Sequence, residues 1–286
     1  MSTSYIKRVE ISKLWGKYDI VWDNLHPDVN ILVGINGSGK STLLKVIYAA
    51  ITGDEKSVEK YKFSSASIQN QHNSHYIDTF YLPKKRKDIK LVGGVGYAGE
   101  FISNCEIIST FDVPTNKSKL RNEESPLMYE LRNLILHTGS NSFNDYRLKA
   151  TQSVDKAIEV NNRIDNLFDL INKLFSNTGK KIGIGESNNL FFDTDDNGYI
   201  FIEQLSAGEK QLLLILFKVF LMEEKPSVLL MDEPEISLHI GWQQDLIETI
   251  RNLNPNCQLI IATHSPSIFG KGWGDKITFM EKLFIN

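Results

Sequence analysis

The sequence predicts an α/β protein with a mostly parallel core sheet, and three observations lead to this fold class. The segments PSVLLMDEPE (residues 226–235) and CQLIIATHSP (residues 257–266) are apolar runs that end in polar or acidic residues. The segment between them, HIGWQQDLIETIRNL, has the spacing of an amphipathic helix. A glycine-rich turn near the N-terminus lies between an apolar strand and a helix. Strands that are apolar on both faces and alternate with helices are typical of a parallel sheet covered by helices.

The first 50 residues predict two strands, a glycine loop and a helix. IKRVEISKL has a strand pattern, and residues 30–33 end a second, buried strand. The loop GINGSGKS follows, and TLLKVIYAAI extends a helix to Ile51, with Gly53 as its stop signal. Residues 54–75 are polar and predict a loop with one short strand, whereas SHYIDTFYLP and CEIISTFDVP predict further strands. We expect the N-terminal strands to form an antiparallel part of the fold.

Residues 125–176 change character and predict a helical insertion. The segments MYELRNLILH and VDKAIEVNNRIDNLFDLINKLF both have helical spacing. The apolar stripe of the second segment consists of Ile158, Ile164, Leu167, Leu170, Ile171 and Leu174. Further on, Asn197-Gly198 between two apolar runs predicts a β-hairpin, which precedes a buried helix. We therefore divide the chain into the N-terminal half of a head domain (1–124), the insertion (125–180) and the C-terminal half of the head (181–286).

The composition argues against several classes of protein. Of the 286 residues, 41% are hydrophobic and 23% are charged, and the formal net charge of −3 does not favour DNA binding by the whole surface. The two cysteines, Cys105 and Cys257, are far apart and lack the spacing of a zinc site, so we expect a reduced, cytoplasmic chain. The N-terminus has no signal-peptide pattern, and the longest apolar runs are too short to span a bilayer. We expect no membrane partner.

The loop GINGSGKS matches the pattern G-x-x-x-x-G-K-[ST] in full, after an apolar strand and before a helix. Its glycines let backbone N–H groups turn inward onto phosphate oxygens, and the helix N-terminus adds partial positive charge. Lys40 is the candidate to reach the β- and γ-phosphates, and Ser41 is a candidate ligand of Mg²⁺. The residues expected to hold a nucleoside triphosphate are Gly34, Asn36, Gly37, Ser38, Gly39, Lys40, Ser41 and Thr42.

Polar residues stand at the ends of the two C-terminal strands. Asp232 follows four apolar residues, at the carboxyl end of a buried strand where α/β sheets bind ligands, and is the second candidate ligand of Mg²⁺. Glu233 is the candidate to orient the attacking water or to accept its proton. His264, at the end of the next strand, can hydrogen-bond the γ-phosphate. The sequence thus predicts a hydrolytic site whose catalytic residues are Lys40, Glu233 and His264.

A second small-residue turn, Ser-Ala-Gly in QLSAGEKQLLLI, lies directly before a long apolar run. Ser206 and Gly208 would stand at the N-terminus of a helix, where backbone N–H groups attract anions. Such a turn is best used when it closes onto a phosphate already held elsewhere. It therefore implies a partner subunit, most simply a second copy of this chain.

In this order, GINGSGKS, LSAGEKQ, LLMDEPE and ATHS resemble the motifs of the ABC-class ATPases. The resemblance implies a P-loop NTPase fold with an ABC-type head, ATP and Mg²⁺ as cofactors, and hydrolysis to ADP and phosphate. It also implies two composite sites between two heads, in which Ser206 and Gly208 of one copy contact the γ-phosphate held by the other. The chain would then form a homodimer or a higher homo-oligomer.

The stretch EPEISLHIGWQ narrows the resemblance to the soluble branch that includes the OLD-type nucleases, RecF and the SMC-like repair proteins. An acid-Pro-Glu followed by Ser-Leu-His and a nearby Trp-Gln is similar to the phage-defence ATPases, among them PtuA of Septu and AriA of PARIS. This resemblance implies an ATP-gated sensor or regulator of a separate effector, a nuclease or a toxin, in bacterial anti-phage defence. The strong motifs cover residues 28–50 and 200–270.

Three other functions stay open at this point. A DNA-repair ATPase of the RecF/SMC-like kind would clamp DNA, a transporter ATPase subunit would need a membrane partner, and a nucleotide-gated scaffold would barely turn over. The EPEISLH stretch and the absence of an assignable Q-loop glutamine argue against the transporter. Gln69 and Gln71 are the nearest glutamines, but they lie in a polar segment ahead of the strand expected to lead there. The intact Glu233 argues against the scaffold.

Some weaker signals concern the nucleotide site itself. Asp112, at the end of CEIISTFD, is a candidate contact of Mg²⁺ or water. Trp15 and Tyr18 are candidates for stacking on adenine, with simple packing as the alternative. GVGYAG (residues 94–99) matches G-x-G-x-x-G, but too few residues separate it from the next strand for a crossover helix. We interpret it as a loop.

Three further features have two interpretations each. The basic run KKRK (residues 84–87) is either a contact for DNA or another phosphate-rich partner, or a solvated loop. The helical stripe within residues 150–176 is either a partner-binding arm or local packing. His239 is either structural or part of a loop that crosses between subunits.

Overall fold

The computed structural model describes residues 5–54, 58, 60–70, 79–84, 88–93, 104–109, 125–136, 141–186, 189–196 and 198–285. The chain divides into two compact units. The first consists of Met1–Thr110, Glu224–Glu235 and Pro255–Asn286, and the second of Phe111–Glu223 and Ile236–Asn254. Among the described residues, none of the helices is long and apolar enough to cross a membrane.

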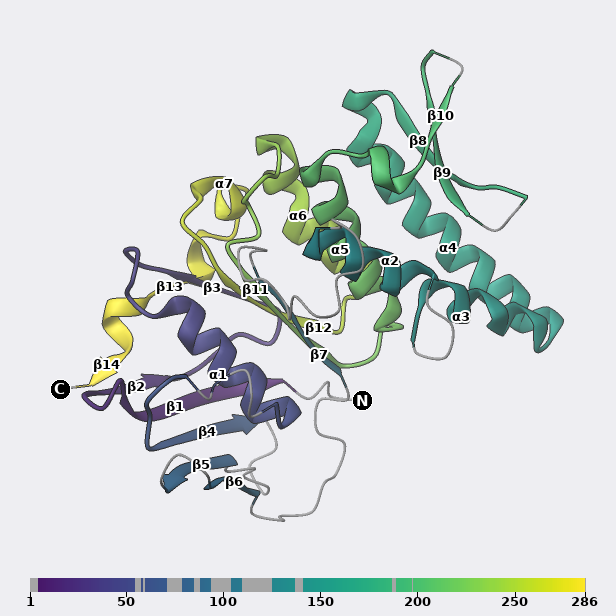
Figure 1. Ribbon diagram of the computed structural model, residues 1–286. Helices are drawn as coiled ribbons and strands as arrows, with labels where there is room; N and C mark the ends of the chain where they lie inside the picture. The colour runs from purple at the N-terminus through teal and green to yellow at the C-terminus, as the bar shows by residue number, and fades with distance from the viewer. Residues whose placement is uncertain are drawn as a thin grey trace. The chain divides into compact units, whose positions relative to one another are not determined.

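A parallel sheet of five strands forms the centre of the first unit, in the order β13-β3-β12-β11-β7 (Figure 1). Every neighbouring pair in it is parallel, which confirms the predicted sheet. Asp232 at the end of β11 lies opposite Ala262 at the end of β12, and Ala262 lies opposite Leu32 of β3, so the carboxyl ends align. The strands are β3 (Val29–Val33), β7 (Asn104–Ile108), β11 (Ser227–Asp232), β12 (Cys257–Ala262) and β13 (Ile277–Phe279).

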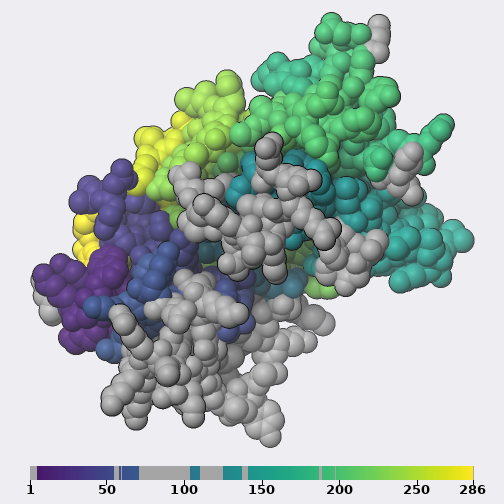
Figure 2. Space-filling view, viewed as in Figure 1, coloured from purple at the N-terminus to yellow at the C-terminus, as the bar shows by residue number. Residues whose placement is uncertain are grey.

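An antiparallel sheet in the order β14-β2-β1-β4 completes the first unit, as the sequence predicts. Its strands are β1 (Ile6–Leu14), β2 (Tyr18–Trp22), β4 (Ser65–Asn70) and β14 (Phe284–Ile285), and β5 (Thr79–Lys84) and β6 (Asp88–Gly93) form a separate antiparallel pair. The C-terminal strand β14 pairs with β2, so the yellow C-terminal segment lies against the purple N-terminal strands (Figures 1 and 2). Residues 277–285 thus add β13 to the parallel sheet and β14 to the antiparallel sheet of four strands, and the sequence predicted neither strand.

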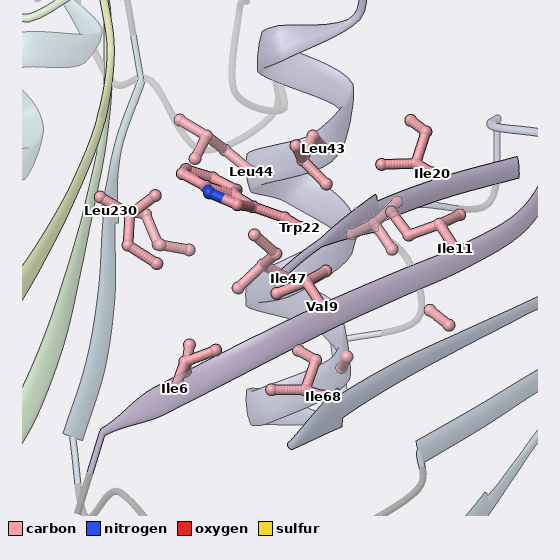
Figure 3. Close-up of a cluster of buried hydrophobic side chains, with 14 of the residues drawn as sticks. Ile6, Val9, Ile11, Ile20, Trp22, Leu43, Leu44, Ile47, Ile68 and Leu230 are labelled. Atoms are coloured by element: carbon pink, nitrogen blue, oxygen red, sulfur yellow. The ribbon is translucent and has the colours of Figure 1, made fainter. Parts of the chain in front are cut away.

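Helix α1 (Lys40–Thr52) packs its apolar side chains against the antiparallel sheet. Leu43, Leu44 and Ile47 meet side chains of β1, β2 and β4, together with Leu230 of β11 (Figure 3). The helical spacing of these residues places them on the covered side, and each fully buried Leu or Ile contributes about 1.5–3 kcal/mol. The helix ends where predicted, at Gly53, whose left-handed backbone lets its N–H donate to Ala49 O at 2.9 Å.

The second unit is mainly helical. Helix α4 confirms the predicted helix but not its whole stripe, because Ile158 is 55% exposed and Leu170 is half-buried. The stripe instead begins at Val160 and runs to Phe175, because the first two turns of α4 are largely exposed. The helices are α2 (Pro126–Leu136), α3 (Phe143–Leu148), α4 (Val154–Phe175), α5 (Ala207–Leu221) and α6 (Ile240–Leu253), whereas the short α7 (Pro266–Phe269) belongs to the first unit.

A three-stranded antiparallel sheet, in the order β10-β9-β8, also belongs to the second unit. It contains β8 (Lys180–Ile184), β9 (Leu190–Thr194) and β10 (Tyr199–Ile200). The predicted hairpin is β9 with β10, but residues 195–198 connect them, so the connection is longer than the predicted two-residue turn. Asn197 lies outside the described residues, and strand β8 was not predicted.

Candidate functional site

The loop between β3 and α1 is shaped by glycines that no other residue replaces without strain. Gly37 and Gly39 have φ angles of 81° and 106°, in the left-handed region. A Cβ on Gly39 would lie 2.5 Å from Cη2 of Trp15, and one on Gly34 would lie 2.9 Å from Cβ of Met280. The glycine pattern of GINGSGKS therefore follows from backbone conformation and from the close approach of Trp15 and Met280.

Lys40 opens α1 and is 5% exposed. Its Nζ donates to the carbonyl oxygens of Gly34 at 3.0 Å and Ile35 at 3.4 Å, so the side chain folds back across the loop. The same Nζ lies 2.6 Å from Nε2 of His264 and 3.9 Å from Oε1 of Glu233. Burial lowers the pKa of Lys40, although the nearby carboxylates oppose this shift. A cation whose hydrogen bonds go to carbonyl oxygens in this way can exchange them for the oxygens of an incoming phosphate.

Ser41 and Asp232 form a pair at the end of β11. The Ser41 hydroxyl donates to Oδ1 of Asp232 at 2.8 Å. Burial raises the pKa of Asp232, while the hydrogen bond from Ser41 acts in the opposite direction. A hydroxyl oxygen and a carboxylate oxygen are hard ligands of the type that Mg²⁺ prefers, so the pair fits a magnesium ion. Within the described residues, no group of three or more His, Cys, Asp and Glu could hold a metal, so other ligands would come from water or phosphate.

Glu233 continues the ladder past the end of β11, since its N–H donates to Ala262 O at 2.8 Å. Its φ of 50° is unusual for a residue with a Cβ, and strain of this kind is common at functional sites. Its Oε1 lies 3.1 Å from Nε2 of His264. Burial, followed by the hydrogen bond to Glu235 and the charge of that residue, raises the pKa of Glu233 to about 8. The surroundings of this carboxyl group therefore favour its protonated form.

These side chains surround one cavity of about 250 Å³ in the first unit. It brings together predicted residues from four separate parts of the sequence: Trp15, Asn36, Gly37, Gly39, Lys40, Ser41, Thr42, Glu233 and His264. Of the two aromatic candidates, Trp15 lines the cavity. Tyr18 instead lies edge-on to Trp15, with ring centroids 6.2 Å apart, and contacts Phe284 at 5.1 Å. Its position matches a packing role behind Trp15.

The second turn lies in the second unit and starts α5. Ser206 Oγ accepts from the N–H of Glu209 at 3.3 Å, and Glu209 Oε2 accepts from the N–H of Ser206 at 2.8 Å, which makes a capping box. Lys180 of β8 donates to Glu209 Oε1 at 2.7 Å. Burial disfavours the charge of Glu209, but the bonds from Lys180 and Ser206 outweigh it and lower the pKa. A Cβ on Gly208 would lie 2.2 Å from Ser237 O, so this glycine is needed for backbone contact.

The remaining candidates are placed as follows. His239 caps α6, where its Nδ1 accepts from the N–H of Gly241 at 3.2 Å. Gln69 lies in β4, opposite Arg8 of β1. Four further features lie outside the described residues: Gln71, Asp112, residues 94–99 and residues 85–87 of the basic run.

Sequence reasoning missed two acids beside this site. Oε1 of Glu235 accepts from Thr263 Oγ1 at 2.6 Å, from the N–H of His264 at 2.9 Å and from the N–H of Ser265 at 3.1 Å. Glu281 accepts from the N–H of Ile35 at 3.2 Å. Glu235 could have been noticed as a further acid in DEPE, two residues after Glu233. Glu281 carries no such signal, because 246 residues separate it from its partner.

A family model described as AAA ATPase domain matches residues 102–269, more than half of the chain. The chain belongs to this ATPase family. Among curated proteins, it is 24% identical to the retron Vc95 probable ATPase of Vibrio cholerae over 243 residues, which cover 80% of this chain and 43% of that protein. It is 21% identical to the Septu protein PtuA of Bacillus thuringiensis over 280 residues, which cover 85% of this chain and 67% of PtuA.

Among solved structures, an SMC head bound to the C-terminal winged-helix domain of ScpA matches with a TM-score of 0.60. The two share 15% identity over 93% of this chain and 92% of the other, so the likeness concerns the fold. The chain is thus an ABC-like P-loop ATPase with an SMC-head-like fold, and the resemblance to PtuA drawn from EPEISLHIGWQ is confirmed. It spans less than half the length of the retron ATPase that it matches.

Proposed function

We propose that the chain binds ATP with Mg²⁺ in the cavity of the first unit and hydrolyses it to ADP and phosphate. The observation that carries this proposal is the meeting of Lys40, Glu233 and His264 within 3.9 Å over a glycine loop. Lys40 would exchange its carbonyl partners for β- and γ-phosphate oxygens, and the inward N–H groups of the loop would hold the rest. Mg²⁺, held by Ser41 and Asp232, would neutralise charge on the phosphates.

Glu233 is the proposed base that orients the attacking water. Because Lys40 can only donate, Nε2 of His264 is its acceptor, and the imidazole proton then lies on Nδ1. Since the pKa of Glu233 is about 8, its proton must leave before the carboxylate can accept one from water. Once Lys40 turns to the phosphates, Nε2 of His264, which lies 3.1 Å from Oε1 of Glu233, would be free to accept that proton and then to donate it to the γ-phosphate. Trp15, which lines the cavity, is the proposed stacking partner of adenine.

We further propose that ATP closes a dimer of this chain, with Ser206 and Gly208 of one copy on the γ-phosphate held by the other. The start of α5 supports this, because it presents helix N–H groups in a unit that does not itself contain the cavity residues. Moving such a pair from mostly open to mostly closed requires about 5 kcal/mol of differential binding. Two capped γ-phosphates are reasonable sources of that free energy.

The proposed biological role is an ATP-gated sensor or regulator of a separate effector, a nuclease or a toxin, in bacterial anti-phage defence. Its support is the similarity to the retron and Septu ATPases. The test is a tagged pull-down of Glu233→Gln from its native host in Mg-ATP, with native mass measurement and protein identification, and with Lys40→Ala as the nucleotide-free control.

A nuclease or toxin that co-purifies with two or more copies of Glu233→Gln, and is lost with Lys40→Ala, would support this role. A bare dimer that retains DNA, with hydrolysis that DNA stimulates and salt weakens steeply, would replace it with a DNA-clamping role. A permease among the partners would point to a transporter subunit instead.

A further inference from the structure

Glu235 connects the loop after β11 to the loop after β12. One carboxylate oxygen, Oε1, accepts three hydrogen bonds, from the Thr263 hydroxyl at 2.6 Å and from the N–H groups of His264 and Ser265 at 2.9 and 3.1 Å. The Thr263 hydroxyl also accepts from the N–H of Ser265 at 2.9 Å, which tightens the same turn. All these residues belong to the first unit.

These bonds begin where the sheet stops holding the two loops together. The β11–β12 ladder runs to Asp232 and Ala262, and its last backbone bond is that from the N–H of Glu233 to Ala262 O. The N–H of Thr263 still donates to Leu32 O of β3 at 3.1 Å, so the N–H groups that need other acceptors are those of His264 and Ser265. A carboxylate that accepts from several N–H groups holds them through charge-assisted bonds, which are stronger than bonds between neutral groups.

The consequence concerns the direction of the His264 side chain. Its Nε2 lies 2.6 Å from Lys40 Nζ and 3.1 Å from Glu233 Oε1, and both contacts depend on the orientation of the backbone at this residue. The backbone N–H of His264 is itself one of the three donors to Glu235. Glu235 therefore contacts the backbone of the residue that carries the imidazole, and it does not itself line the cavity.

We infer that Glu235 is the positioning residue for His264: its carboxylate fixes residues 263–265 so that the imidazole meets Lys40 and Glu233. The expected effect on hydrolysis rests on the proposed function. The positioning of His264 by the hydrogen bonds to Glu235 does not depend on it. The competing view is that Glu235 only stabilises the fold. Gln258, near the start of β12, provides a matched control because its buried side chain also ties separate segments, accepting from Ile6 N–H at 2.8 Å and donating to His26 O at 2.8 Å.

The first experiment is amide hydrogen exchange in the nucleotide-free protein. Glu235→Ala should speed exchange at His264 by about 10-fold or more, because its acceptor is lost. The effect at Ser265 should be smaller, because its N–H also donates to the Thr263 hydroxyl. Glu235→Gln keeps an acceptor oxygen and should stay closer to the wild type. Gln258→Ala should lower Tm but leave these two amides as protected as before. Unchanged exchange at His264 and Ser265 in Glu235→Ala would overturn the inference, whether or not the protein hydrolyses ATP.

The second experiment is a kinetic comparison with His264→Ala. Glu235→Ala should lower kcat by about 10- to 100-fold, the range found when a group that orients a functional side chain is removed. The Kd for ATP should change by less than about 3-fold, because Lys40 and Ser41 are untouched. Adding Glu235→Ala to His264→Ala should cost little more, and Glu235→Gln should restore part of the rate. If the losses in kcat of the two single variants were fully additive in the double variant, Glu235 would not act through His264. If the wild type itself did not hydrolyse ATP, the proposed function would be wrong, but the exchange experiment would still test the positioning of His264.

Discussion

The two glycine turns of this chain look alike in sequence but differ in what surrounds them. In the first unit, GINGSGKS has two glycines in the left-handed region and a lysine, a hydroxyl, a carboxyl group and an imidazole around one cavity. In the second unit, Ser206 has an ordinary extended backbone with φ of −63°, and Gly208 is required by contact with the Ser237 carbonyl. The first turn is built as a cradle, and the second as the start of a helix.

The charges near the second turn are already used within its own unit. Lys180 pairs with Glu209, and Lys210 donates to the carbonyl of Glu203 at 2.8 Å. The turn therefore offers backbone N–H groups and the Ser206 hydroxyl, with neighbouring lysines engaged elsewhere. A phosphate would bind the first turn by itself, but would meet the second only when another group already holds it.

Altering each turn separately tests most directly whether the first turn alone binds ATP. Lys40→Ala should weaken ATP binding by at least about 1,000-fold, which corresponds to about 4 kcal/mol, because no other described side chain replaces its charge in the cavity. Ser206→Ala should leave binding to the isolated monomer within about 3-fold but reduce ATP-driven dimer formation and hydrolysis. Titration of a fluorescent ATP analogue and sedimentation measure the two effects.

Lys17→Ala is the charge control for this experiment. Lys17 is an exposed lysine whose Nζ lies 4.9 Å from the centroid of the Tyr18 ring, near the site but outside the cavity. Its loss should change ATP affinity by less than about 2-fold. If Lys40→Ala bound ATP as well as this control does, the first turn would not be the ATP-binding loop.

Glu233, beside the first turn, and Glu209, in the second, should also respond to pH with opposite signs. Glu233 has its pKa raised from 4.5 to about 8, so between these values the native protein keeps a proton that the unfolded chain has lost. The free energy of unfolding then falls as pH rises through this window, by about 2–4 kcal/mol, and Glu233→Gln should remove that fall. Glu209 has its pKa lowered, so its contribution is present above 4.5 and is lost as pH falls through the lower, folded-state pKa.

Urea unfolding at a series of pH values checks both signs in the nucleotide-free protein. Glu233→Gln should flatten the curve between about pH 4.5 and 8, and Glu209→Gln should flatten it below 4.5. A parallel shift of the whole curve in either variant, without a change of slope, would mean that the group is not titrating differently in the folded state.

Much of the first unit was predictable because its signals are local. Apolar runs that end in Asp232 and before His264, and a glycine loop between a strand and a helix, specify β11, β12, β3 and α1 without reference to distant residues. The lysine and the two acids then meet because parallel strands align their carboxyl ends. Sequence reasoning therefore proposed the residues that line the cavity.

What was missed depends on partners far along the chain. Strands β13 and β14 contain three and two residues, too few for a pattern, and exist because β3 and β2 offer free edges. Ile158 fits the helical stripe by spacing, but its side chain is exposed because burial depends on which neighbouring elements reach that turn. The contact between Glu281 and Ile35 spans 246 residues, and no local rule connects them.

Gly208→Ala and Gly39→Ala should show that the two turns need glycine for different reasons. In Gly208→Ala the new Cβ would meet a backbone carbonyl at 2.2 Å, which cannot rotate away, so we expect a loss of about 1–3 kcal/mol in the free energy of unfolding. In Gly39→Ala the obstacle at 2.5 Å is the Trp15 side chain, which can move, although the left-handed backbone itself costs about 1–2 kcal/mol. Trp15→Ala should relieve part of the defect of Gly39→Ala and none of that of Gly208→Ala, as urea unfolding of the double variants would show.

The smallest expected effect concerns Glu281, an acid far along the chain that contacts the first turn. Glu281 accepts from the N–H of Ile35, and its negative charge lies near the site proposed for phosphate. Glu281→Gln keeps the acceptor oxygen but removes the charge, so ATP should bind about 2- to 5-fold more tightly. Calorimetric titration should show that the gain shrinks as salt is added, because screening weakens the repulsion in the wild type. Weaker binding by Glu281→Gln would instead mean that the full carboxylate is needed to hold the loop in its binding shape.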